Sequence, residues 1–245
     1  MKTTLIIARH GNTFRKDETP TRAGASTDIP LVEKELATAI GGYLKANNLM
    51  PDVIFTSPLI RTIQTAVYAM EAAGLDEFPL NITNLFKEVD YGPDENKIEE
   101  EVELRLGRHS LEQNNQFHAG LNPEQIREQG KKVIGLWNSK AIVPHGWNVS
   151  PEEMIEGWKS FVQNIEKNYE NKVVLVVTSN GVARFSPHIT KSFDEFSANH
   201  KLKISTGAVC IFEKSIGDEC WNNVIWNHRP TPLNCDSEEQ DQLAT

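Results

Sequence analysis

The chain opens with the stretch Thr3-Thr4-Leu5-Ile6-Ile7-Ala8-Arg9-His10-Gly11-Asn12-Thr13, in which an apolar run changes abruptly into a polar loop. Residues 3–8 predict a buried β-strand, because a short continuous apolar run suits a strand that is covered on both faces. The run is too short for the apolar region of a secretion signal, and it leads directly into Arg9 and His10. This strand is the first of a predicted buried sheet.

Similar apolar runs recur along the chain and alternate with helical patterns. Further strands are predicted at residues 53–56, 172–178 and 207–213, with an edge strand expected near 224–226. Strands separated by helices predict an α/β fold, as a three-layer α/β/α sandwich with a mostly parallel central sheet. We expect one domain over residues 1–233, with a helical excursion at about 92–150, and a disordered acidic tail over 234–245.

Two helices carry local start signals. Ser57 is placed to cap a helix whose first position is Pro58, and Gly74 marks the end of that helix. Ser150 and Glu153 form a capping-box pattern before a run of apolar residues at helical spacing. These signals predict where the second and third main helices begin.

The composition limits the partners of the protein. With 25 Lys and Arg against 34 Asp and Glu, the formal net charge is -9, whereas nucleic acids and anionic membranes require an extended basic surface. We therefore expect neither as a partner. A small anionic substrate remains open, because it needs only a local pocket of arginines and backbone amides. The three cysteines form no C-x-x-C pair, which favours a reducing, cytoplasmic location.

The motifs of common cofactor and metal sites are missing from the sequence. The Cys and His spacings match no zinc pattern, and neither a P-loop nor a G-x-G-x-x-G dinucleotide motif occurs. We therefore expect no cofactor and no metal. The site has to be sought among the ordinary side chains of the chain.

Three loops follow the predicted parallel strands, at the edge where such sheets bind ligands. They are Arg9 to Thr13, Ser57 to Arg61, and Ser179-Asn180-Gly181. An arginine beside a histidine at a buried strand end loses solvation unless a ligand or partner is present, and a phosphate would be such a ligand. The sequence therefore points to a phosphate site at this edge.

The first loop has the residue types that a phosphate site needs. Arg9 can hold phosphoryl oxygens bidentately, Gly11 allows close backbone approach, and Asn12 and Thr13 can add hydrogen bonds. An isolated Arg-His pair is more often structural. Arg61 changes that balance, because it puts a second guanidinium near the same edge. Arg15, Lys16 and Arg22 either contact the rest of an anionic substrate or form a solvated loop.

Together these features resemble the histidine phosphatase superfamily, also called the phosphoglycerate mutase-like superfamily, over most of residues 3–213. The resemblance is carried by Arg9-His10-Gly11-Asn12-Thr13, Asp28-Ile29-Pro30-Leu31 and Ser57-Pro58-Leu59-Ile60-Arg61-Thr62-Ile63-Gln64-Thr65-Ala66. It implies a phosphoglycerate mutase-like fold, with His10 as phosphate acceptor and Arg9 and Arg61 as phosphoryl-binding residues. It also implies that Glu88 donates the proton to the leaving oxygen.

The chain departs from this family at the third strand end, where Ser-His-Gly is replaced by Ser179-Asn180-Gly181. Asn180 keeps a hydrogen-bond donor for the phosphoryl group but never carries a proton-linked charge. Some stabilisation of the transition state is therefore expected to be lost.

Three functions follow, in order of preference. The first is a metal-independent phosphatase that hydrolyses a small phosphomonoester through a phosphohistidine on His10. The second is a phosphoglycerate mutase, although Asn12-Thr13-Phe14-Arg15 differs from the mutase-like continuation. The third, motivated by Asn180, is a catalytically impaired phosphate-binding or regulatory module. The sequence leaves the substrate and the oligomeric state open.

Overall fold

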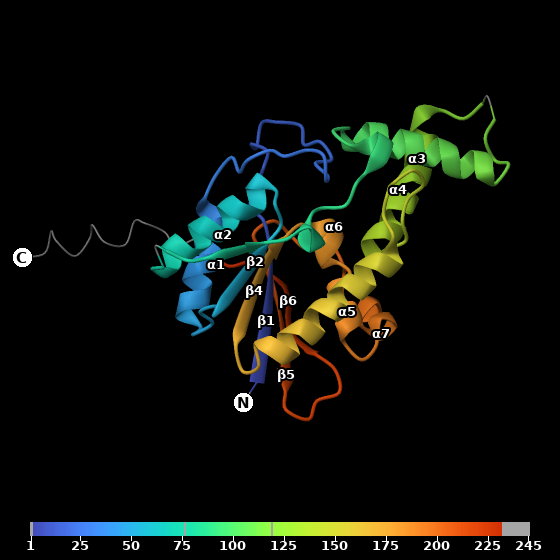
Figure 1. The fold of residues 1–245 in the computed structure, drawn as a ribbon. Helices are drawn as coiled ribbons and strands as arrows, with labels where there is room; N and C mark the ends of the chain where they lie inside the picture. The colour runs from blue at the N-terminus through green and yellow to red at the C-terminus, as the bar shows by residue number, and fades with distance from the viewer. Residues whose placement is uncertain (1, 76, 119, 232–245) are drawn as a thin grey trace, which may run out of the picture.

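The computed structural model describes residues 2–75, 77–118 and 120–231 (Figure 1). The tail expected over residues 234–245 lies outside the described residues. At the centre is a six-stranded sheet with the order β3-β2-β4-β1-β5-β6. Its strands are β1 (Lys2–Arg9), β2 (Val53–Thr56), β3 (Leu80–Ile82), β4 (Val173–Thr178), β5 (Val209–Ser215) and β6 (Asn222–His228).

The sheet is mostly parallel, as the sequence predicts. β4 lies between β1 and β2 and is parallel to both, and β2 is parallel to β3. β5 runs antiparallel to β1, and β6 runs antiparallel to β5. The carboxyl ends of β1, β2 and β4 therefore meet at one edge, which brings together the three loops singled out in the sequence.

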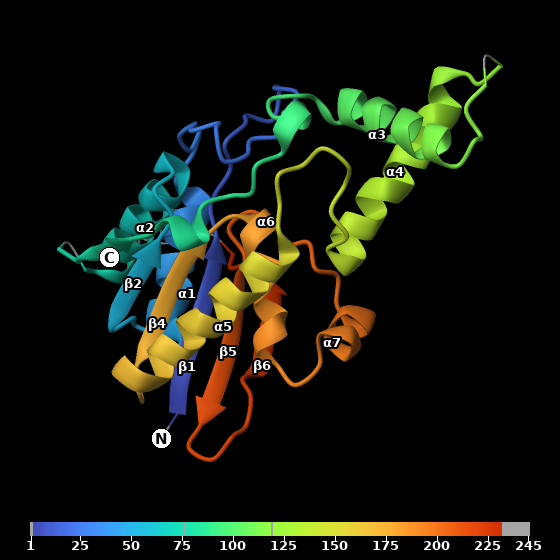
Figure 2. The ribbon, with the colours of Figure 1, turned by 45° about the vertical axis from the view of Figure 1, so that its right-hand side comes forward.

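Helices cover both faces of the sheet (Figures 1 and 2). The helices of the described residues are α1 (Glu35–Ala46), α2 (Ile60–Ala73), α3 (Glu99–Gln113), α4 (Pro123–Lys140), α5 (Pro151–Asn168), α6 (Asn180–Ala183) and α7 (Phe193–Asn199), with short 3-10 turns η1 (Asn84–Phe86), η2 (Gly92–Asp94) and η3 (Ser186–Ile189). α1 and α2 pack on one face and α5 on the other.

The apolar run of β1 shows why both faces need cover. Successive side chains of a strand point to opposite faces. Leu5 and Ile7 accordingly enter the core on the α5 side, while Ile6 and Ala8 enter the core on the α1 and α2 side. All four are almost completely buried. The predicted three-layer α/β/α sandwich is confirmed.

One predicted helix start is wrong and the other is confirmed. α2 begins at Ile60 rather than at Pro58, and its N-cap position is Leu59. The Ser57 hydroxyl instead accepts the Leu59 backbone N–H at 3.3 Å, because the chain makes one more turn at the strand end before it becomes helical. Ser150 does cap α5, accepting the backbone N–H of Glu153.

Residues 92–150, which we call the cap, extend from the sandwich beyond the carboxyl ends of the strands (Figure 2). Its helices α3 and α4 pack closely against each other. A Cβ atom added to Gly107 would lie 1.9 Å from the Ile126 carbonyl oxygen, and one added to Gly130 would lie 1.9 Å from the Glu103 carbonyl oxygen. Only glycine permits this close backbone approach.

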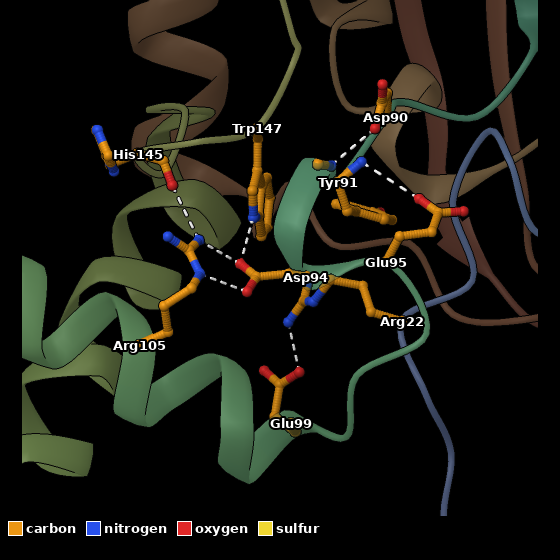
Figure 3. A network of polar contacts seen from close by, with 10 residues as sticks. Arg22, Asp90, Tyr91, Asp94, Glu95, Glu99, Arg105, His145 and Trp147 are labelled. Atoms are coloured by element: carbon orange, nitrogen blue, oxygen red, sulfur yellow. Dashed lines mark hydrogen bonds and ion pairs between the residues drawn. The ribbon is translucent and has the colours of Figure 1, made fainter.

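A buried carboxylate ties the cap together (Figure 3). Asp94, which is 1% exposed, accepts hydrogen bonds from Nε of Arg105 at 2.6 Å and from Nε1 of Trp147 at 2.7 Å. Arg105 also donates to the His145 carbonyl. The contacts join the start of the cap to α3 and to the segment that leads back to α5.

Candidate active site

The loops after β1 and β4 lie side by side because their strands pair in register. Arg9 is the partner of Thr178, the last residue of β4, and the His10 backbone N–H donates to the Thr178 carbonyl at 3.0 Å. Gly181, in α6 directly after β4, makes room for Glu88: a Cβ atom added there would lie 2.2 Å from Glu88 Oε1. The sheet edge thus brings His10, Arg9 and Glu88 together.

His10 is a buried, neutral imidazole. Its ring is buried, and Nδ1 lies 2.7 Å from the Gly11 carbonyl oxygen. A carbonyl oxygen only accepts, so Nδ1 carries the hydrogen and Nε2 keeps its lone pair. Burial, followed by the charges of Arg9 and Arg61, lowers the pKa of His10 well below 6.5. The imidazole is therefore unprotonated at neutral pH.

Arg9 and Arg61 are fixed by backbone carbonyls. Arg9 Nη1 donates to the Ile204 carbonyl, and Arg61 Nη1 donates to the Thr27 carbonyl at 2.6 Å. Carbonyl groups orient a guanidinium without neutralising its charge. Burial lowers the pKa of both Arg9 and Arg61. Each Nε atom is buried without a hydrogen-bond partner among the described residues. Arg9 lines the cavity, and the charges of both arginines act on His10.

Glu88 has the environment of a carboxylic acid. It is 6% exposed, and burial raises its pKa, against the opposing effects of the Val89 backbone N–H and of Arg61 and Arg9. Burial disfavours the charged form of a carboxyl group, so Glu88 retains its proton to a higher pH than an exposed glutamate does. This is the property that a proton donor to a leaving oxygen needs.

The remaining predicted residues have more mixed surroundings. Asn12 and Asn180 both line the cavity, as does Thr13. The Asn12 amide already donates to Glu33 and accepts from the Thr206 hydroxyl, at 2.6 and 2.7 Å. Asn180 Oδ1 accepts the Ile204 backbone N–H at 2.8 Å, which leaves Nδ2 as its donor. Their roles toward a phosphoryl group stay predictions.

These residues surround a cavity of about 740 Å³ between the strand ends and the cap. Arg9, His10 and Glu88 line it from the sandwich, whereas Ile134 and Trp137 line it from α4. Arg61 is fully buried and does not line the open cavity, although its charge acts on both His10 and Glu88. The cap therefore covers the site without contributing the predicted catalytic groups.

Sequence reasoning missed Arg184 as a site residue. It is fully buried, lines the cavity, and lies over the Trp137 ring with its Cζ 3.9 Å from the ring centroid. Its Nη1 donates to the Trp137 carbonyl, and burial lowers its pKa to about 10. The sequence signal was an arginine one helical turn after Asn180. The sequence alone does not show that this arginine packs against Trp137 of α4.

Arg22 also lines the cavity, and its contact with the rest of a substrate stays a prediction. Its guanidinium lies over the rings of Tyr91 and Trp147 and forms an ion pair with Glu99 of α3 (Figure 3). Arg15 lines the cavity as well, but Lys16 is not among its lining residues. The cavity lining therefore includes both positively and negatively charged side chains.

Residues 2–75, 77–118 and 120–231 contain no group of three or more His, Cys, Asp or Glu side chains arranged to hold a metal ion. Among the helices of the same residues, none combines the length and the apolar character that a membrane span requires.

Three known proteins or structures set this geometry in context. A 2,3-bisphosphoglycerate-dependent phosphoglycerate mutase of Bartonella quintana is 31% identical over 185 residues, covering 74% of this chain and 77% of that protein. A phosphoglycerate mutase structure from Bacillus anthracis superposes with a TM-score of 0.67 at 18% identity, covering 93% of this chain and 94% of that one. A mycobacterial glucosyl-3-phosphoglycerate phosphatase superposes with a TM-score of 0.63 at 16% identity, covering 93% and 100%.

The family assignment follows from sequence and fold together. The two structures, at these identities, support the fold alone. Residues 5–135 match the family model of the histidine phosphatase superfamily (branch 1). That match covers more than half of the chain and includes His10, Arg61 and Glu88. The protein belongs to the histidine phosphatase superfamily.

Proposed function

We propose that this protein is a phosphatase that hydrolyses a small phosphomonoester through a phosphohistidine on His10. The observation that carries the proposal is the state of His10: a buried, neutral imidazole whose Nδ1–H is held by Gly11, next to two guanidinium groups. Such an imidazole has its Nε2 lone pair available for attack on phosphorus.

The first half of the reaction forms the phosphoenzyme. Nε2 of His10 bonds to phosphorus while the bond between phosphorus and the ester oxygen breaks. Arg9 and Arg61 balance the negative charge on the phosphoryl oxygens. Glu88 gives its proton to the departing oxygen, so the product leaves as a neutral alcohol.

The second half returns the enzyme to its starting state. Water attacks phosphorus, the bond between phosphorus and Nε2 breaks, and the Glu88 carboxylate takes the proton that water releases. Asn12, Thr13 and Asn180 are the further residues that we propose for phosphoryl contact. Apart from the substrate and one water molecule, the cycle uses only side chains of this chain.

The cavity supports a substrate with a substantial non-phosphoryl part. A volume of about 740 Å³ is far larger than a phosphoryl group needs, and the wall contributed by the cap is polar and aromatic. We therefore propose a small phosphorylated molecule as substrate. The free thiols of Cys210 and Cys220 are compatible with a cytoplasmic location for this activity.

Phosphoglycerate mutase activity is the second candidate, favoured by the mutase of Bartonella quintana at 31% identity. In that case the phosphoryl group on His10 would return to an organic product instead of passing to water. The impaired binding module is the third. Arg9 and Arg61 alone would serve that role, whereas the buried acid Glu88 has no task in it.

The test measures phosphate release from a panel of phosphorylated metabolites, with mutase turnover of phosphoglycerate measured alongside. Radiolabelled phosphoryl groups should accumulate on the wild-type protein in a base-stable, acid-labile form, and neither label nor hydrolysis should appear for His10→Ala. His118→Ala, which changes an exposed histidine outside the cavity, is the matched control. Full phosphatase activity of His10→Ala would refute the proposal, and mutase turnover in excess of phosphate release would favour the second candidate.

A further inference from the structure

Asn227 lies inside β6 but has a backbone conformation that strands do not have. Its φ is 56°, in the left-handed region, where residues with a side chain are uncommon. The other left-handed asparagines of the described residues all lie in turns, namely Asn48, Asn96, Asn115 and Asn171. A residue is held in such a conformation only when its surroundings require it, and these residues cluster at functional sites. The side chain of Asn227 is therefore expected to have a use.

A β-bulge puts Asn227 in this conformation. Opposite the single residue Cys210 of β5, β6 has two residues, Trp226 and Asn227. A bulge bends its strand and changes the direction of a side chain. Both residues of this bulge reach one segment: Trp226 Nε1 donates to the Lys201 carbonyl at 2.8 Å, and Asn227 Oδ1 accepts the Ser205 backbone N–H at 2.7 Å. This segment, residues 201–208, leads from α7 to β5, and we call it the strap.

The strap lies against the candidate site. Two of its residues, Lys203 and Thr206, line the cavity. The Gly207 backbone N–H donates to the Arg9 carbonyl at 3.2 Å. The Arg9 side chain returns to the same segment, because its Nη1 donates to the Ile204 carbonyl at 2.5 Å. The position of the Arg9 guanidinium therefore depends on the strap.

One peptide group of the strap joins Asn227 to Arg9. The carbonyl of Ile204 and the N–H of Ser205 belong to the same peptide unit, and that unit is planar. Asn227 holds the N–H of the unit, and Arg9 donates to its oxygen. Water could satisfy the exposed Ser205 N–H in the absence of Asn227, but it would not fix the direction of the peptide plane. Asn227 thus sets the direction of the carbonyl that holds Arg9.

Asn180 holds the preceding peptide unit. Its Oδ1 accepts the Ile204 backbone N–H at 2.8 Å. Asparagine side chains therefore hold both peptide units of Ile204, one from α6 and one from β6. The tie to Asn180 does not depend on Asn227, so a change at Asn227 should loosen one peptide unit and leave the strap in place.

We propose that Asn227 is a positioning residue, which orients Arg9 toward the phosphoryl group through the Ile204–Ser205 peptide. The inference rests on the proposed function and adds to it a residue that is not among those lining the cavity. A guanidinium is a planar fork, so a carbonyl that fixes one Nη atom also fixes the directions of the other N–H groups. Asn227 itself touches no substrate and transfers no proton.

The test compares Asn227→Gly with Asn227→Asp. Glycine allows the left-handed backbone but removes the acceptor oxygen, whereas aspartate keeps an acceptor oxygen. In Asn227→Gly, kcat/KM for phosphomonoester hydrolysis should fall about 3- to 10-fold, as expected for the loss of one hydrogen bond. Inhibition by inorganic phosphate should weaken by a similar factor, and the shape of the pH profile should not change. Asn227→Asp should stay closer to the wild type than Asn227→Gly does.

Asn171→Gly is the matched control. It makes the same exchange at another left-handed position, where φ is 61°, in the turn before β4 and outside the cavity lining. It should keep the wild-type rate and the wild-type inhibition by phosphate. An equal loss in Asn171→Gly and Asn227→Gly would assign the effect to the glycine backbone and overturn the proposal.

A spectroscopic measurement follows Arg9 directly. The side-chain ¹⁵N signals of Arg9 can be identified by their loss in Arg9→Lys. A guanidinium held by a carbonyl rotates slowly about its Nε–Cζ bond, so its two Nη signals should be resolved in the wild type and in Asn171→Gly. In Asn227→Gly they should move toward a single averaged signal. A change in stability alone would not produce this averaging in the folded protein.

The outcomes keep the two proposals apart. Unchanged Arg9 signals in Asn227→Gly would overturn the role of Asn227, and wild-type hydrolysis in the same experiments would leave the phosphatase standing. If the wild type hydrolyses nothing, the Arg9 signals still decide: averaging in Asn227→Gly that is absent from Asn171→Gly supports the positioning of Arg9 by Asn227.

Discussion

Replacing Glu88 by Gln tests the protonation step most directly. Glutamine keeps the size of the side chain and a polar end, but it has no proton to give to a leaving oxygen. Glu88 is 6% exposed, and its burial raises the pKa of the carboxyl group. The wild-type side chain is therefore the acid form over a wider pH range than an exposed glutamate. Glu88→Gln removes that acid while leaving Arg9, His10 and Arg61 in place.

The expected loss depends on the substrate. Removal of a general acid costs about 10²–10⁴-fold in rate when the leaving oxygen needs protonation, as an alkyl alcohol does. A nitrophenyl phosphate has a leaving group that is stable as an anion, so its hydrolysis should fall much less. The ratio of the two rates, measured as kcat/KM for wild type and variant, isolates the protonation step from phosphate binding.

Glu112→Gln provides the control, because Glu112 is exposed near the end of α3 and lies outside the cavity. An equal loss for the alkyl and the aryl substrate would refute the role of Glu88 as a proton donor and assign it to positioning. Unchanged rates for both substrates would remove it from the mechanism.

Glu88 also links stability to pH. Its folded pKa is raised, so the folded chain binds this proton at pH values where the unfolded chain has released it. The wild type therefore loses stability as pH rises through the folded pKa, by about 1.36 kcal/mol for each unit of pKa elevation. Glu88→Gln lacks this loss. Urea unfolding across a pH series should therefore show the free energy of unfolding of the variant rising relative to that of the wild type as pH rises.

Two further predictions concern His10 and Asp94. The ring ¹⁵N signals of His10 can be identified by their loss in His10→Ala. As pH falls through 6.5, they should remain those of the neutral imidazole with its hydrogen on Nδ1. Protonation with a midpoint at 6.5 would contradict the argument that burial lowers the pKa of His10. Asp94→Ala should lower the free energy of unfolding by about 1–3 kcal/mol, since it leaves Trp147 Nε1 and Arg105 Nε without their acceptor. An unchanged urea midpoint would show that other contacts hold the cap.

Local patterns were sufficient for much of the sandwich. The apolar residues of the run at 3–8 would face both sides of a sheet, which favours a strand with cover on both sides, and Ile6 and Ile7 indeed enter opposite cores. Ser150 caps α5 because an N-cap hydrogen bond spans three residues and needs no distant partner. The start of α2 was predicted wrongly because it depends on the tertiary structure. Ser57 lies at a buried strand end, and the chain turns once more there before α2 starts.

The sequence by itself determined which candidate site residues follow which strand. Arg9 and His10 follow the first strand, Arg61 follows the second, and Ser179 to Gly181 follow a third. Only the tertiary structure decided which atoms of these residues have hydrogen-bond partners. It paired Asn180 with Ile204, left the Nε atoms of Arg9 and Arg61 without a partner among the described residues, and set Arg184 against Trp137 of the cap. The physical reason is that a hydrogen bond or a desolvated charge between residues far apart in the chain depends on register and packing, which no local spacing encodes.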